Sequence, residues 1–189
     1  MKNLTSVSLC AVALAALGLS ACSSMGGGQM ASMPPFSQAA LPDVVKVPAG
    51  NRVAMETIGA GDITYECRAK KDMADQFEWV FVGPDAALTD RTGKRIGRYF
   101  GPPATWESMD GSKVTGAQLA VSPAGAANIP LQLVKANPAM GAGSMQGVTY
   151  IQRVATQGGV APAAPCAATS MGQKQIVNYQ ADYIFWRAS

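Results

Sequence analysis

The chain has 189 residues, which is enough for one domain with a substantial buried core. Its 15 Lys and Arg residues against 12 Asp and Glu residues give a net charge of +3, too small an excess to favour a nucleic acid as partner. The sequence has no histidine, which excludes Ser-His and Cys-His nucleophilic pairs and histidine-bound zinc. We therefore expect no metal site and no cofactor. The 20 glycines and 12 prolines favour a loop-rich β protein over a helical bundle.

The first residues have the pattern of a secretory signal. Lys2 and a short polar stretch precede an apolar run over residues 7–19, which is too short for an ordinary membrane-spanning helix. The stretch Leu19-Ser20-Ala21-Cys22 follows and resembles the lipobox of bacterial lipoproteins, in which the cysteine takes a lipid. The pattern predicts a signal peptide over residues 1–21 and lipidation of Cys22. The alternative is a plain signal peptide that happens to end near a cysteine.

Lipidation of Cys22 would place the protein in the cell envelope. No later segment has enough consecutive apolar residues to span a bilayer, so we expect the acyl chains alone to attach the protein to the membrane. In bacterial lipoproteins an aspartate after the cysteine commonly causes retention in the inner membrane, and here Ser23 stands in that place. The resemblance therefore implies the periplasmic side of the outer membrane. The oligomeric state stays open.

The four cysteines have different expected fates. Cys10 leaves with the signal peptide and Cys22 becomes the anchor, so that Cys67 and Cys166 remain. In an oxidising compartment two thiols most simply pair. A bridge between them would close a loop of about 100 residues, which in the chain-entropy model contributes roughly 4.7 kcal/mol. The alternatives are unpaired buried thiols or a redox pair, although neither cysteine lies in a C-x-x-C spacing.

Composition predicts a lipidated flexible tether over residues 22–43 and a single all-β domain over residues 44–189, because residues 23–42 carry no charged side chain and are rich in Ser, Gly and Pro. Period-two patterns predict strands over 44–47, 52–58 and 63–67, with a turn at 59–62 between the last two. A strand over 77–82 is expected to stop at the turn-like Gly83-Pro84-Asp85.

Further strands are expected over 96–100, 113–121, 131–135, 148–156 and 176–186, with a hairpin turn at Asp110-Gly111. Long loops rich in Gly, Pro and Ala separate several of them, at 137–147 and 158–165. Many short strands with such separators favour an antiparallel β-sandwich or barrel.

The densest polar cluster is residues 106–113. Trp106 stands beside Glu107, Asp110 and Lys113, and an indole with such neighbours could hold a sugar ring or another polar ligand. The alternative is that Trp106 fills one end of the core while Glu107 and Asp110 form an ordinary solvated turn. We take these four residues, together with Tyr65 and Arg153, as candidate ligand-binding residues.

Arg153 lies in the strand Tyr150-Ile151-Gln152-Arg153-Val154, which otherwise reads as well buried. Its side chain could reach the surface, pair with Glu66 or Asp182, or present its guanidinium to an anionic ligand. Glycoside hydrolysis would need two facing carboxylates, and the candidates are Glu66, Glu107, Asp110 and Asp182. Alternation places Asp182 on the face opposite the neighbouring aromatic residues, so its charge is expected to point outward.

Several segments together resemble the domain-of-unknown-function 3455 family of bacteria and fungi. They are Tyr65-Glu66-Cys67; Trp79 to Phe81 with Gly83-Pro84-Asp85-Ala86 and Leu88; Gly93 and Gly97; Gly101-Pro102 and Thr105-Trp106-Glu107; Asp110-Gly111-Ser112; Ile129-Pro130; Val148-Thr149-Tyr150-Ile151-Gln152-Arg153 and Thr156; Gly158-Gly159; Ala161-Pro162; Cys166; and Tyr179-Gln180-Ala181-Asp182-Tyr183-Ile184-Phe185. The resemblance covers nearly the whole domain.

The resemblance implies a single secreted or envelope domain and pairing of Cys67 with Cys166. Two positions depart from the family pattern, since Tyr99 or Phe100 stands where a histidine is frequent and Leu131 where a tryptophan is frequent. The family supplies no catalytic residues. We expect a non-enzymatic binding module for a small molecule, a glycan or an envelope partner. The alternatives are a carboxylate-dependent hydrolase acting on envelope glycans and a purely structural envelope protein.

Overall fold

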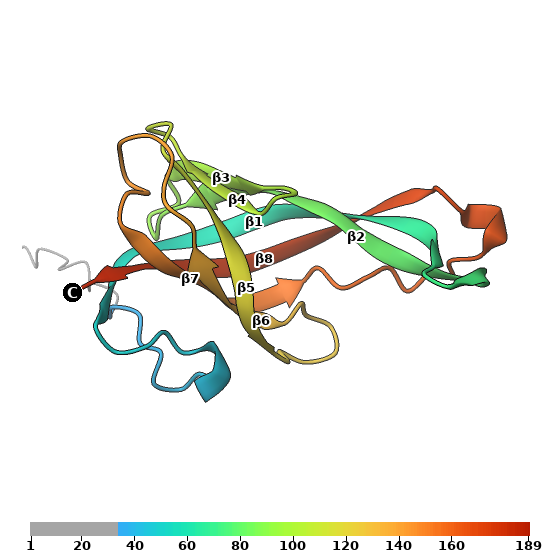
Figure 1. Ribbon diagram of the computed structural model, residues 1–189, viewed down its shortest axis with the longest axis horizontal. Coiled ribbons are helices and arrows are strands. Elements are labelled where there is room, and N and C mark those ends of the chain that lie inside the picture. Colours follow the sequence, from blue (N-terminus) through green and yellow to red (C-terminus); the bar gives the residue numbers. More distant parts are fainter. Residues whose placement is uncertain (1–33) are drawn as a thin grey trace, which may run out of the picture. The chain divides into compact units, whose positions relative to one another are not determined.

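Eight antiparallel strands close into one barrel in the computed structural model, which describes residues 34–189 (Figure 1). The strands are β1 (Asn51–Lys70), β2 (Met73–Thr89), β3 (Arg95–Phe100), β4 (Thr105–Ser108), β5 (Lys113–Ser122), β6 (Leu131–Ala136), β7 (Val148–Gly158) and β8 (Lys174–Ala188), with short 3-10 turns η1 (Asp43–Val45) and η2 (Ala168–Ser170). Each strand pairs with the next in sequence and β8 pairs with β1. The all-β prediction is confirmed, as a barrel. The expected signal peptide and Cys22 lie outside the described residues.

β1 is one continuous strand, and the turn expected at residues 59–62 is wrong. Both of its neighbours pair with it through this region, since Gly59 lies opposite Leu88 of β2 and Ala181 of β8. A Cβ atom on Gly59 would lie only 2.5 Å from Cε2 of Tyr183. One on Gly61 would overlap the backbone of Asp85. The glycines therefore allow close packing inside the ring, where composition alone suggested a turn.

β2 also runs on where a turn was expected, through Gly83-Pro84-Asp85. Its residues 73–84 pair with β1 but not with β3, because the β2–β3 ladder covers only Asp85 to Thr89. This part of β2 and the matching parts of β1 and β8 form a three-stranded extension beyond the ring, on the right of Figure 1. A central strand accepts Pro84 poorly, but here the proline has only one paired neighbour.

The disulfide between Cys67 and Cys166 is confirmed, with a Cα–Cα distance of 5.5 Å. It joins β1 to the segment 159–173 that connects β7 with β8. The indole Nε1 of Trp79 donates to the carbonyl of Ala164 over 2.7 Å, and the backbone N–H of Cys67 donates to Gln173 over 2.9 Å. These contacts fasten the connecting segment to the extension.

The barrel interior follows the period-two pattern of β8. Tyr179, Ala181, Tyr183 and Phe185 are all buried in the central core cluster, while Asp182 between them lies on the opposite face, as expected. The alternation then ends, because Ile184 and Trp186 on the outer face are buried as well. A second apolar layer must therefore cover the outside of β8 at this end.

The second layer is residues 36–47, which we call the strap. Val45 and Val47 of the strap pack with Ile184 and Trp186 on the outer face, and the ring of Phe36 meets Trp186 edge-on at 6.3 Å. The strand expected over 44–47 is wrong: residues 43–45 form η1, and the strap binds through side chains without joining the sheet. Among the described residues packing on the barrel thus starts at Phe36, earlier than the boundary at residue 44 expected from composition.

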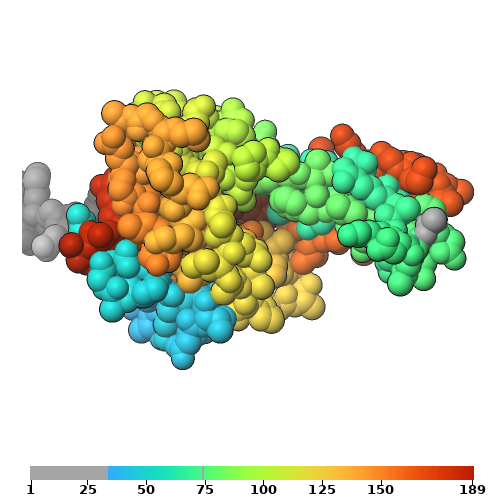
Figure 2. Space-filling model, in the orientation of Figure 1, coloured from blue at the N-terminus to red at the C-terminus, as the bar shows by residue number. Residues whose placement is uncertain are grey.

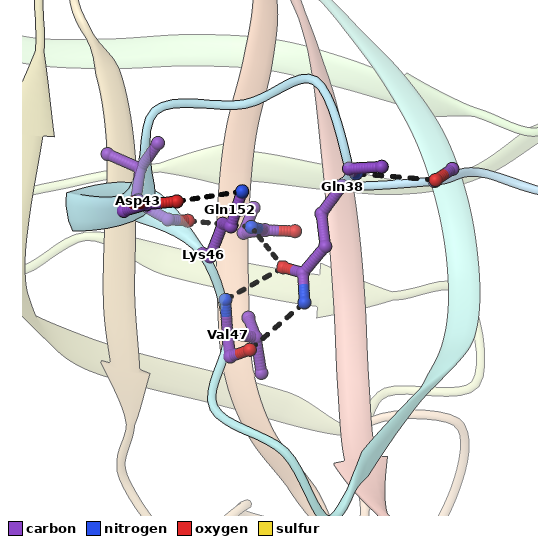
Figure 3. A network of polar contacts seen from close by, with 8 residues as sticks. Gln38, Asp43, Lys46, Val47 and Gln152 are labelled. Carbon is purple, nitrogen blue, oxygen red and sulfur yellow. Dashed lines mark hydrogen bonds and ion pairs between the residues drawn. The ribbon is translucent and has the colours of Figure 1, made fainter.

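Gln152 connects the strap to the barrel (Figure 3). Its side chain is fully buried on the outer face of β7, and its Nε2 donates to the carbonyl of Val45 over 2.7 Å and to Oε1 of Gln38 over 3.1 Å. Its Oε1 accepts from Nε1 of Trp186 over 2.9 Å. Gln38 in turn bonds the N–H and the carbonyl of Val47. One buried amide on β7 therefore satisfies a polar group on β8 and two on the strap. Within residues 34–189 no helix is long and apolar enough to cross a membrane.

Replacing Gln152 with leucine should destabilise the protein by about 2–5 kcal/mol, because the buried N–H of Trp186 and the carbonyl of Val45 lose their partner. Urea unfolding followed by tryptophan fluorescence measures the change. Gln157→Leu is the matched control, since Gln157 is exposed on the same strand. Its free energy of unfolding should change by about 0.5 kcal/mol or less. Equal stabilities of the two variants would contradict the assigned role of Gln152.

Candidate functional site

A pocket of about 340 Å³ opens into the barrel from its side, and we call it the barrel pocket. Its size lies at the lower end of the range of about 300–1,000 Å³ that is usual for small-molecule sites. Strands from β2 to β7 and the turn before β4 supply its lining: Phe81, Tyr99, Ala104, Trp106, Gly116, Gln118, Gln132, Val134 and Arg153. Figure 2 shows the surface hollowed between the yellow strands β5 and β6 and the green β2.

Aromatic rings form the inner wall of the barrel pocket. Tyr99 and Trp106, neighbours on β3 and β4, stack with ring centroids 4.7 Å apart, and both are almost fully buried. Tyr183 packs behind them, 5.0 Å from Tyr99 and 5.9 Å from Trp106 between centroids. The indole Nε1 of Trp106 is buried and has no hydrogen-bond partner among the described residues. The wall therefore combines a flat apolar surface with an unused donor.

Arg153 brings a positive charge to this pocket. Period-two alternation on β7 points Gln152 outward to the strap and Arg153 inward, on the side of the buried Ile151. Its Nε and Nη2 donate to the carbonyl of Pro130 over 3.1 and 2.9 Å. A guanidinium has five N–H donors, so three remain after these two bonds. Within the described chain Arg153 forms no ion pair, and the expected pairing with Glu66 or Asp182 is wrong, since these carboxylates bind other cations.

The charge of Arg153 acts on the tyrosines inside the barrel. Burial raises the pKa of Tyr65, Tyr99, Tyr179 and Tyr183, and in each case the nearby guanidinium opposes that rise. All four hydroxyls stay protonated near neutral pH, so none can neutralise Arg153. These tyrosines therefore give the partly buried Arg153 no counter-charge.

The polar rim consists of two amides. Gln118 of β5 and Gln132 of β6 lie on neighbouring strands, and Nε2 of Gln132 donates to Oε1 of Gln118 over 2.6 Å. Phe81, which is half exposed, lies at the edge of the pocket. The lining contains no carboxylate. The pocket therefore offers hydrogen-bond donors and one positive charge, with few acceptors to match them.

The structure brings together three of the six candidate residues. Trp106 and Arg153 line the barrel pocket, and Tyr65 lies close by, with its ring 6.1 Å from that of Phe81 and its hydroxyl donating to the carbonyl of Gly159 over 2.9 Å. Glu107 and Lys113 point to the outer face, where Nζ of Lys113 lies 3.0 Å from Oε1 of Glu107. They are direct cross-strand partners of β4 and β5. Alternation along β4 separates Trp106 from its charged neighbours.

Asp110 lies outside the barrel pocket, where its side chain holds two loops together. Its carboxylate accepts from the backbone N–H of Ser112 over 2.9 Å and from that of Ser144 over 2.7 Å, and from the hydroxyls of both serines. These bonds, led by those from the serine hydroxyls, hold the pKa of Asp110 well below its usual range. The side chain thus joins the β4–β5 turn to the long loop 137–147.

The remaining hydrolase candidates are also engaged elsewhere. Glu66 pairs with Arg68, with 3.0 Å between Oε1 and Nε, and Asp182 pairs with Arg91, with 2.9 Å between Oδ2 and Nη2. None of the four carboxylates lines the barrel pocket. Across residues 34–189 there is no group of three or more Cys, Asp or Glu residues placed to hold a metal ion.

Of the lining residues, sequence reasoning found Trp106 and Arg153 and missed the others, among them Phe81, Tyr99, Gln118 and Gln132. Tyr99 lies directly opposite Trp106 in the β3–β4 ladder, so the two side chains share one face of the sheet. The period-two pattern of the strand around Tyr99 could have indicated this. The two glutamines and Phe81 carry no such local signal. They come from β2, β5 and β6, which only the closed ring brings to one pocket.

Asp110→Asn should lower the melting temperature at neutral pH, because an amide nitrogen would face serine donors that now bind oxygen. The pKa of this carboxyl is depressed in the folded state, so its stabilising effect is fully present above the unfolded value of about 3.9 and declines as pH falls below it. The difference in melting temperature between wild type and variant should therefore be constant above about pH 5 and should narrow, without closing, as the pH falls to about 3.

Asp75→Asn is the control for this series, since Asp75 is exposed on β2 and makes no hydrogen bond or ion pair within the described chain. Its melting temperature should match wild type throughout. A gap between wild type and Asp110→Asn that stays constant with pH would contradict the assigned role.

The comparisons with known proteins agree with the resemblance drawn from the residues. No match to this chain was found among the curated proteins or among the solved structures. The matched family is described as "Protein of unknown function (DUF3455)", and the match covers residues 48–187, which includes β1 to β7 and β8 up to its last residue but one. The chain therefore belongs to the DUF3455 family.

Proposed function

We propose that this protein is a binding module of the bacterial cell envelope, tethered to the periplasmic side of the outer membrane by a lipid on Cys22, which takes a small molecule into the barrel pocket without transforming it. The observation that carries the proposal is the lining of that pocket. Stacked aromatic rings face a side chain, Arg153, that has donors left over after its structural bonds. Apolar walls with few well-placed polar groups are typical of small-molecule sites.

The support for a binding role over hydrolysis comes from where the carboxylates lie. Acid and base catalysis on a glycan needs two carboxyl groups on either side of the scissile bond. Glu107 and Asp182 are paired with cations on the outer face, and Asp110 holds a loop crossing. The pocket has none of these groups, whereas its rings and guanidinium suit recognition.

The support for envelope attachment comes from the sequence. Leu19-Ser20-Ala21-Cys22 has the lipobox pattern, and Cys67 and Cys166 form the disulfide that an oxidising compartment permits. In the sequence, residues 23–35 lie between the proposed lipid and Phe36, where the strap begins.

Blocking the pocket should abolish ligand binding while the fold persists. Gln118 is exposed at the rim, so Gln118→Trp fills the entrance without disturbing the core. Extracts of envelope small molecules are equilibrated with the purified protein, and the molecules retained are identified by mass spectrometry. Wild type should retain a defined compound that Gln118→Trp loses by at least tenfold.

Gln146→Trp is the matched control, because Gln146 is an exposed glutamine outside the pocket. It should bind as wild type does. Recovery of a chemically altered compound from wild type would favour the hydrolase. Absence of any retained compound would favour the purely structural envelope protein.

Cys22→Ala should release the protein from membranes or leave it unprocessed, because no other residue can accept the lipid at that site. Membrane fractionation and the intact mass of the mature protein measure the effect. The wild-type mass should show acyl chains on a chain that starts at Cys22. An unchanged mass and unchanged membrane fractionation in the variant would overturn the anchor.

A further inference from the structure

We infer that the barrel pocket selects small organic anions that carry a planar ring, with Arg153 binding the anionic group and the Tyr99–Trp106 wall receiving the ring. This inference rests on the proposed function, because it names the class of ligand for the same pocket. It is carried by the charge balance of the lining, the placement of the guanidinium and the geometry of the rings.

The charge balance favours an anion. Arg153 contributes a full positive charge, the lining includes no carboxylate, and the ion pairs of the described chain involve other cations. Arg153 is only partly buried, so its charge is accessible to a ligand, and no ion pair among the described residues occupies it. An anionic ligand would supply the missing negative charge, and the partly apolar surroundings would strengthen the interaction relative to water.

The placement of the guanidinium favours a carboxylate or a similar oxyanion. Nε and Nη2 both bond the carbonyl of Pro130, which restrains the plane of the group. The N–H donors that remain can contact two oxygens of one planar acid, as arginine commonly does. The Nε2 groups of Gln118 and Gln132 add amide donors to the lining. Donors in excess of acceptors suit a ligand rich in acceptor oxygens.

The aromatic wall favours a flat body. Tyr99 and Trp106 lie nearly parallel, with an interplanar angle of 19°, and Tyr183 and the buried core hold them in place. A preformed wall loses little side-chain entropy when a ring stacks on it. The half-exposed Phe81 at the edge can close over the same ring. A pocket of about 340 Å³ limits the ligand to a small molecule.

The experiment compares four probes by titration calorimetry with the purified protein: benzoate, its neutral analogue benzamide, the non-aromatic cyclohexanecarboxylate, and methyl glucoside as a neutral sugar. Benzoate should bind at least tenfold tighter than benzamide and measurably tighter than cyclohexanecarboxylate. Its affinity should fall as salt rises, since ions screen the pairing with Arg153, while that of benzamide should not change. These comparisons use only the wild-type protein.

Variants then assign the effect to one residue. Arg153→Met retains the long stem without the charge and should lose the preference for benzoate over benzamide, whereas Arg153→Lys should keep part of it. Arg52→Met removes an exposed arginine of β1 and should leave all affinities unchanged. Circular dichroism verifies that each variant is folded.

The outcomes separate the two proposals. Equal affinities for benzoate and benzamide that Gln118→Trp abolishes would overturn the anion class and leave the binding pocket standing. Stronger binding of methyl glucoside than of benzoate would likewise overturn it in favour of a glycan site. Binding of benzoate that Gln118→Trp does not reduce, or no binding of any probe up to about 10 mM, where even a ligand with a Kd of about 1 mM would be seen, would overturn the pocket as well.

Discussion

The pairing of β1 with β8 is the constraint on which the rest of the structure depends. The two strands are the first and last of the sheet, and their ladder runs from Asn51 opposite Ala188 to Glu66 opposite Lys174. It closes the ring and so leaves no open sheet edge there. β1 is also paired with β2 along most of its length, so one 20-residue strand joins the barrel to the extension. Gly59 and Gly61 make this possible, because any larger residue would meet Tyr183 or β2.

Closure has different effects on the two faces of β7 and β8. Inside the ring, aromatic residues fill the core and leave Arg153 beside the barrel pocket. Outside, the strap buries Ile184, Trp186 and the neighbouring Gln152. Gln152 and Arg153 are adjacent in sequence, yet Gln152 donates hydrogen bonds to the strap and Arg153 lines the barrel pocket. The period of a β-strand alone separates these roles. The same period points Trp106 into the pocket and Glu107 to an ion pair on the surface.

Three of the six candidate residues predicted from the sequence therefore lie in or beside the barrel pocket. The sequence marks Trp106 as an indole in a polar cluster, Arg153 as a charged residue in an apolar strand, and Tyr65 as part of an alternating strand. Glu107, Asp110 and Lys113 were grouped with Trp106 because they are close in sequence, but a turn and an alternating strand send them to other places. Gln118 and Gln132 look like ordinary surface glutamines in the sequence. They become pocket residues only because β5 and β6 curve past Arg153.

The sequence by itself determined the all-β class, the positions of most later strands and the pairing of Cys67 with Cys166, because alternation, turn residues and cysteine number are local or countable properties. Only the tertiary structure decided that the sheet closes, that Gly59 and Gly83 lie within strands, and that the strap packs without joining the sheet. The physical reason is the same in each case. A glycine that permits close approach and a glycine that permits a turn are identical in sequence, and only the neighbour across the ladder distinguishes them.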